Sequence, residues 1–179
     1  MRCCGRFLVL MFFVCISAAA CSGKRLSPTV VKNVDLARYA GTWYEIARFP
    51  HSFEKGLVCV TATYTINPDG AIAVVNAGRL ERDRSQRKEA RAKAWVPDPA
   101  EPGKILVQFF WPFRGNYWII GLDGAGYRYA VVAGPSPDYL WILSRSKTMD
   151  ATLYDSLVAL ARSQGFDVSR LERVDQSCE

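Results

Sequence analysis

Side chains that carry enzyme chemistry are scarce in this sequence. His51 is the only histidine among 179 residues, which argues against a zinc site built from several imidazoles and leaves acid–base chemistry to carboxylates, Tyr or Lys. We expect neither a metal nor a cofactor, and we expect His51 to be an exposed loop residue. Three of the six cysteines fall in an apolar N-terminal segment. The other three, whose chemistry needs an explanation, are Cys21, Cys59 and Cys178.

The N-terminal segment is typical of a secretory signal peptide. Arg2 and Arg6 make the first residues basic, an apolar run covers Phe7–Ile16, and three alanines precede Cys21. The run is too short to span a bilayer as a helix, so a permanent transmembrane anchor is the weaker interpretation. We therefore predict that residues 1–20 are removed after export.

Small residues followed directly by Cys21 resemble a bacterial lipobox, in which the cysteine is diacylated and becomes the new N-terminus. The acyl chains would hold the protein on a membrane. By the same resemblance, Ser22 in place of an aspartate implies the outer membrane. This predicts a lipidated tether over residues 21–32 and a folded domain over residues 33–179. Plain cleavage, giving a soluble periplasmic protein, is the alternative.

Cys59 and Cys178 remain as an even pair in an oxidising compartment, which favours a disulfide. The bond would join an early strand to the C-terminus. A nucleophilic or redox role for Cys59 is the alternative, although no histidine and no CxxC motif stands next to it in the sequence.

The elements that position these residues are short strands separated by Gly, Pro and Asn turns, such as Asn67-Pro-Asp-Gly70. Connections this short cannot hold crossover helices, so the sheet must be antiparallel. Eight such strands predict a closed up-and-down β-barrel, whereas a β-sandwich would need a long return connection. The strands are expected from Trp43 to before Pro50 and over Val58–Ile66, Ala71–Leu80, Glu89–Val96, Ile105–Phe110, Tyr117–Leu122, Arg128–Ala133 and Tyr139–Ser144.

One segment has helical spacing of its apolar residues. Thr148–Gln164 places leucines on one stripe, with Thr148 or Asp150 as a cap and Gly165 as a stop. Its polar face lacks a basic cluster, which favours packing on the outside of the barrel over a membrane surface. A final short strand is expected within Phe166–Val174.

Three motifs in the expected order resemble those of the lipocalins. They are Gly41-Thr-Trp43-Tyr-Glu45 with the preceding Asn33 to Tyr39, then Asp138-Tyr-x-Trp141, then Ile142-Leu-Ser-Arg145. Within that family the likeness is greatest to bacterial outer-membrane lipoproteins and to apolipoprotein D. The resemblance implies a barrel open at one end that holds a small apolar ligand.

Trp43 and Arg145 are expected to close the other end of the barrel. The first and last strands of a closed barrel are neighbours, so the guanidinium can cover the indole face and donate to carbonyls of the turn at residues 36–40. Both residues are structural in this interpretation.

Strand parity and the family resemblance together predict the lining of the cup. Parity turns Trp43, Glu45 and Ala47 inward, together with the small side chains of Ala90, Ala92 and Ala94. Small residues leave space that a filled core would not, although a fully packed barrel is the alternative. The ligand-binding residues expected from the resemblance are Tyr39, Tyr64, Val74, Asn76, Phe109, Tyr117, Trp141 and Leu143. Phe49 and Phe53 could form a lid over the mouth.

Residues 79–93 carry seven basic and three acidic side chains. A solvated face is the expectation, with attraction to anionic lipid headgroups as the second interpretation. Export removes nucleic acid as a partner.

The resulting hypothesis is a non-enzymatic, membrane-tethered barrel that holds fatty acids or lysophospholipids in the bacterial envelope. The alternatives are an isomerase-like enzyme that uses Cys59 and an interaction scaffold. The sequence leaves open whether the protein forms a homodimer.

Overall fold

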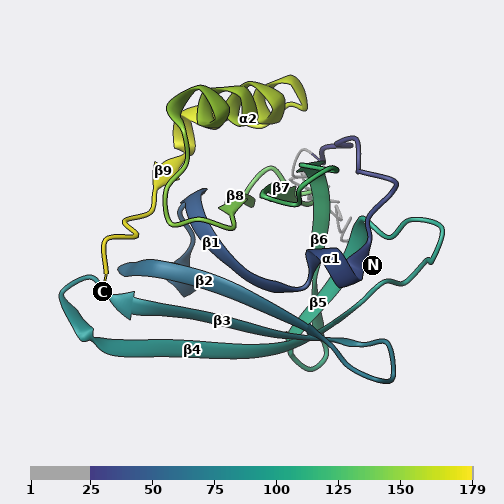
Figure 1. Ribbon diagram of the computed structural model, residues 1–179, viewed down its shortest axis with the longest axis horizontal. Helices are drawn as coiled ribbons and strands as arrows, with labels where there is room; N and C mark the ends of the chain where they lie inside the picture. Colours follow the sequence, from purple (N-terminus) through teal and green to yellow (C-terminus); the bar gives the residue numbers. More distant parts are fainter. Residues whose placement is uncertain (1–24, 179) are drawn as a thin grey trace, which may run out of the picture.

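The computed structural model describes residues 25–178, and they form one closed antiparallel barrel with a helix on its outer wall (Figure 1). Each strand pairs with its sequence neighbours, and β1 pairs with both β2 and β8, which closes the ring. The predicted eight-stranded up-and-down barrel is confirmed, and the β-sandwich alternative is wrong. The barrel strands are β1 (Gly41–Arg48), β2 (Leu57–Ile66), β3 (Ile72–Leu80), β4 (Asp83–Trp95), β5 (Lys104–Phe110), β6 (Phe113–Leu122), β7 (Tyr129–Ala133) and β8 (Leu140–Ser144).

Strand boundaries differ from the sequence expectation in the polar segments. β4 begins at Asp83 rather than Glu89, because its backbone pairs with β3 through the whole basic segment, out to Leu80 opposite Asp83. Backbone pairing of this kind leaves no hydrophobic pattern in the sequence. The C-terminal strand β9 covers only Glu172–Arg173 and pairs with the end of β1.

Helix α2 (Ala151–Ser163) packs on the outside of the barrel. The Asp150 carboxylate accepts a hydrogen bond from the Leu153 amide at 3.0 Å, which identifies it as the cap. Leu157 and Ala161 are buried in an outer apolar cluster with side chains of β7 and β8. No helix of the described residues is both long and apolar enough to cross a membrane.

The base of the barrel is closed as the sequence predicts. The guanidinium carbon of Arg145 lies 3.8 Å from the centre of the Trp43 ring. Its nitrogens donate to the carbonyls of Thr42, Arg38, Tyr39 and Ala40 at 2.8–3.0 Å. The short helix α1 (Leu36–Tyr39) supplies two of these four carbonyls and is itself capped by Asp35.

A bulge in β1 changes which side chains face the cup. The register against β8 shifts between Glu45 and Ala47, so strict alternation ends there. Ala47 belongs to the outer cluster, which makes its predicted inward orientation wrong. Arg48 is buried instead and pairs with Glu45.

The N-terminal segment is docked from Leu26 onward. The Leu26 amide donates to the Pro135 carbonyl at 2.8 Å, and the Val31 amide donates to the Ile119 carbonyl at 2.9 Å. Leu26 is buried in the outer cluster, so the predicted tether 21–32 is fixed to the barrel over its second half. The predicted signal peptide and the lipidation site Cys21 lie outside the described residues.

Candidate functional site

The cup is filled at its base and open toward its mouth. Inward-facing pairs on β3 and β4 show this directly: Ile72 and Ala94 are buried, whereas Asn76 is half-buried and its partner Ala90 is exposed. Val74 and Ala92 stand between these two levels. An exposed side chain on the inner face of a barrel borders free space, so the mouth half of the interior is accessible from outside.

Three tyrosine hydroxyls form the floor of this space. Tyr117 Oη lies 2.7 Å from Tyr39 Oη and accepts a hydrogen bond from Tyr64 Oη at 2.8 Å. Burial raises the pKa of all three phenols, so they stay neutral. Three hydroxyl hydrogens share these two bonds, which leaves one O–H available to donate to another group.

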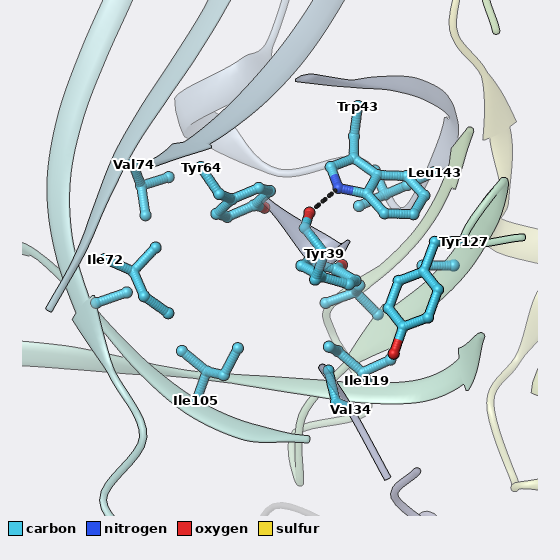
Figure 2. Packing of buried hydrophobic residues seen from close by; sticks show 13 residues of the cluster. Val34, Tyr39, Trp43, Tyr64, Ile72, Val74, Ile105, Ile119, Tyr127 and Leu143 are labelled. Atoms are coloured by element: carbon cyan, nitrogen blue, oxygen red, sulfur yellow. Dashed lines mark hydrogen bonds between the residues drawn. The ribbon is translucent and has the colours of Figure 1, made fainter. Parts of the chain in front are cut away.

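Below the hydroxyls, apolar side chains of several strands surround Tyr39 and Trp43 (Figure 2), and the indole donates to the Tyr39 carbonyl at 2.8 Å. A cavity of about 10 Å³ among Leu36, Ile72, Ile105 and neighbouring residues has room for one water molecule. The interior below the three hydroxyls is therefore packed apart from this small cavity.

Six of the eight predicted ligand-binding residues come together in or against the inner apolar cluster. Tyr39, Tyr64, Val74 and Leu143 belong to the inner apolar cluster, and Tyr117 and Trp141 pack against it. Asn76 lies nearer the mouth, and its Oδ1 atom is buried without a hydrogen-bond partner among residues 25–178. Phe109 is 36% exposed at the end of β5. Their contact with a ligand stays a prediction.

Sequence reasoning missed a buried ionic cluster on the wall near the mouth. Arg48 Nη1 donates to Glu45 Oε1 at 2.6 Å, and its Nη2 donates to the carbonyls of Glu54 and Leu57 at 3.1 Å. Burial, followed by the nearby Glu54 carboxylate, raises the pKa of Glu45 to about 8. The bulge in β1 turns Arg48 inward, and the sequence pattern gives no sign of that bulge.

His51 belongs to the same cluster, and its predicted exposure is wrong. Its side chain is only 6% exposed, with Nε2 placed 2.9 Å from Glu54 Oε2. The imidazole stacks on Phe53 with ring centres 3.8 Å apart and lies 5.4 Å from the Trp141 ring. The 3₁₀ turn η1 (Ser52–Glu54) folds His51 back over the barrel wall. No periodic pattern in the sequence predicts this turn.

The two phenylalanines expected to form a lid have different positions. Phe49 is fully buried in the outer cluster beside Phe166, so it cannot cover the mouth. Phe53 is 59% exposed at the rim, where Tyr139 stacks on Trp141 with ring centres 5.9 Å apart.

Cys59 and Cys178 are joined by a disulfide, as the sequence predicts. Cys59 has a positive φ of 52° beside the register shift in β2, and its amide donates to the Asp175 carbonyl, which brings the C-terminal segment alongside. The free thiol that the enzyme alternative requires is therefore not present in this structure. Among the described residues, no group of three His, Cys, Asp or Glu side chains is arranged to hold a metal ion.

The family model of the lipocalin-like domain matches residues 34–176, which span the entire barrel. The chain belongs to the lipocalin family. It is 47% identical over 148 residues to the outer membrane lipoprotein Blc of Escherichia coli K12, a match that covers 83% of this chain and 82% of that protein. It is 34% identical over 160 residues to apolipoprotein D of Macaca fascicularis, covering 86% and 83%.

Solved structures share the fold at lower identity. Insecticyanin from the tobacco hornworm superposes with a TM-score of 0.68 at 23% identity, over 86% of each chain. The cockroach allergen Per a 4 superposes with a TM-score of 0.66, over 87% of this chain and 96% of that one. These similarities concern the architecture.

Proposed function

We propose that this lipocalin binds a single-chain lipid, a fatty acid or a lysophospholipid, in the open half of its barrel and transports or stores it in the bacterial envelope. The observation that carries the proposal is the graded inner wall. It is apolar and closed at the tyrosine floor and lined by small alanines toward an open mouth. An apolar wall of this kind suits an acyl chain.

Asn76, on the inner wall nearer the mouth, stands where the polar end of a bound lipid would meet it. The Asn76 Oδ1 atom, which has no hydrogen-bond partner among the described residues, and the spare tyrosine O–H at the floor add to the polar groups of the ionic cluster on the inner wall. Buried polar atoms of this kind need a water or ligand partner. Each methylene that leaves water contributes about 0.8 kcal/mol, so a long chain binds without specific recognition of its head group.

The proposed location is the outer membrane, with a lipid anchor on Cys21. It is supported by the lipobox-like sequence before Cys21 and by the similarity to proteins named outer membrane lipoprotein Blc in Escherichia coli and Vibrio cholerae, at 47% and 42% identity. Mass spectrometry of the mature N-terminus tests the anchor: a diacylated Cys21 supports it, and an unmodified N-terminus refutes it.

Displacement of a fluorescent fatty acid tests the binding proposal. Purified protein should bind the probe, and both palmitate and lysophosphatidylglycerol should displace it. Trp141→Ala, on the inner wall, should weaken probe binding. Tyr129→Ala, on the neighbouring strand and packed toward the outer cluster, is the control that should leave it unchanged. Failure of the wild-type protein, freed of co-purified lipid, to bind the probe would refute the proposal.

A further inference from the structure

We propose that the mouth of the barrel docks on a bilayer containing anionic phospholipid, with the β5–β6 hairpin inserting into the interface and the basic β3–β4 hairpin contacting the headgroups. The inference concerns a surface outside the cup. It depends on no particular ligand inside it.

The distribution of exposed apolar side chains is the first observation. Seven large hydrophobic residues are exposed in the described chain, and all except Ile66 lie at or beside the connections that surround the mouth. The tip of the β5–β6 hairpin is the extreme case, with Phe110 75%, Trp111 85% and Phe113 77% exposed. Side chains this exposed neither cover the cup nor pack on the barrel wall, so they need a partner outside the chain.

Basic side chains stand beside this aromatic tip. Lys93 pairs with Gln108 where β4 and β5 last meet, and Arg91 on β4 and Phe110 on β5 each lie two residues further along their strands toward the mouth. The Arg91 side chain is 77% exposed, and Arg87, further along β4, is 60% exposed. Aromatic side chains beside arginine and lysine are the combination that settles at a membrane–water interface and attracts anionic lipid.

Charge also favours a membrane over a second copy of the chain. Residues 79–93 hold seven basic and three acidic side chains, and most of them are exposed. Two mouths facing each other would bring these like charges together, whereas an anionic bilayer neutralises them.

The start of the described chain lies at the same end of the barrel. Leu26 is hydrogen-bonded to Pro135 in the β7–β8 connection, which in an up-and-down barrel shares its end with the β5–β6 connection. Four residues separate Leu26 from Cys21, and the five residue steps between them span at most about 18 Å. This step rests on the proposed acylation of Cys21, and the aromatic and charge observations do not.

A bilayer at the mouth gives a lipid a direct route into the cup. The acyl chain would leave the membrane between the aromatic hairpin and the rim formed by Phe53 and Tyr139 without crossing bulk water. The exposed aromatics then serve loading as well as attachment.

Vesicle co-sedimentation of Cys21→Ala protein, which has no acylation site, tests the proposal apart from the anchor. We expect binding to phosphatidylcholine–phosphatidylglycerol vesicles, weaker binding to phosphatidylcholine alone, and loss of binding at high salt. The double variant Trp111→Ser/Phe113→Ser should lose roughly tenfold or more in partitioning. Ile66→Ser, which removes an exposed apolar residue at the opposite end, is the matched control and should bind as before.

A second variant and two further measurements decide the remaining outcomes. Arg87→Glu/Lys88→Glu should weaken binding to the anionic vesicles while leaving the melting temperature unchanged. Vesicle binding that survives both double variants would overturn the proposal. So would self-association, seen by sedimentation velocity, that depends on Trp111 in protein that does not bind vesicles. Fatty-acid displacement on the same variants should stay at the wild-type level, and its failure in all of them would refute ligand binding in the cup but not docking.

Discussion

Filling the cup from its wall should remove lipid binding without unfolding the protein. Ala92 faces inward opposite Val74, one level below the exposed Ala90. In Ala92→Phe, the ring would project into the open half of the interior and take the space of roughly four methylene groups of a bound chain. At about 0.8 kcal/mol per methylene, the loss is about 3 kcal/mol, or roughly 150-fold in Kd.

The assay is displacement of a fluorescent fatty acid, together with thermal unfolding of the same samples. Ala73→Phe is the matched control: Ala73 neighbours Val74 on β3 and pairs with Lys93, so its side chain faces the outside of the barrel. We expect the control to bind the probe as wild type does. Wild-type affinity in a folded Ala92→Phe variant would refute the location of the site, and equal losses in both variants would refute its restriction to the inner wall.

Three further predictions concern stability. Arg145→Met should lower the free energy of unfolding by about 2–4 kcal/mol, because it removes four short hydrogen bonds to carbonyls and the contact with the indole. Urea unfolding should show a change of less than about 0.5 kcal/mol for the exposed control Arg87→Met. Equal effects of the two substitutions would contradict the role of Arg145 in closing the base of the barrel. Cys59→Ser/Cys178→Ser should lower the free energy of unfolding by about 2–4 kcal/mol in the same measurement. An unchanged urea midpoint would show that the disulfide does not stabilise the fold. Because burial raises the pKa of Glu45 to about 8, the folded state holds this proton more tightly than the unfolded state, so stability should fall as pH rises from about 5 to 8, by at most about 1.4 kcal/mol per pH unit. Glu45→Gln should flatten that part of the profile, and an equally steep profile in the variant would contradict the assignment.

Much of the architecture could be predicted from the sequence because it depends on local patterns. Turn residues such as Asn67-Pro-Asp-Gly70 separate alternating segments, and short connections permit only antiparallel neighbours. The contact of Trp43 with Arg145 follows from closure, since the first and last strands must meet. Residues such as Tyr64 and Val74 were placed correctly on the inner face by strand parity and by resemblance to the family.

The errors at Ala47, Arg48 and His51 share one physical cause, which is backbone irregularity that leaves no trace in side-chain periodicity. One bulge in β1 turns Ala47 outward and Arg48 inward. One 3₁₀ turn buries His51 against Glu54. The burial of Leu26 has a different cause: a single apolar residue within the predicted tether carries no period, yet it fills a position in the outer cluster.

Native mass spectrometry of protein gently extracted from cells tests the central claim most directly. Wild-type protein should carry one added mass that matches a fatty acid or a lysophospholipid, and Ala92→Phe should carry none. Empty wild-type protein, or an identical added mass on folded Ala92→Phe, would contradict a lipid site in the open half of the barrel.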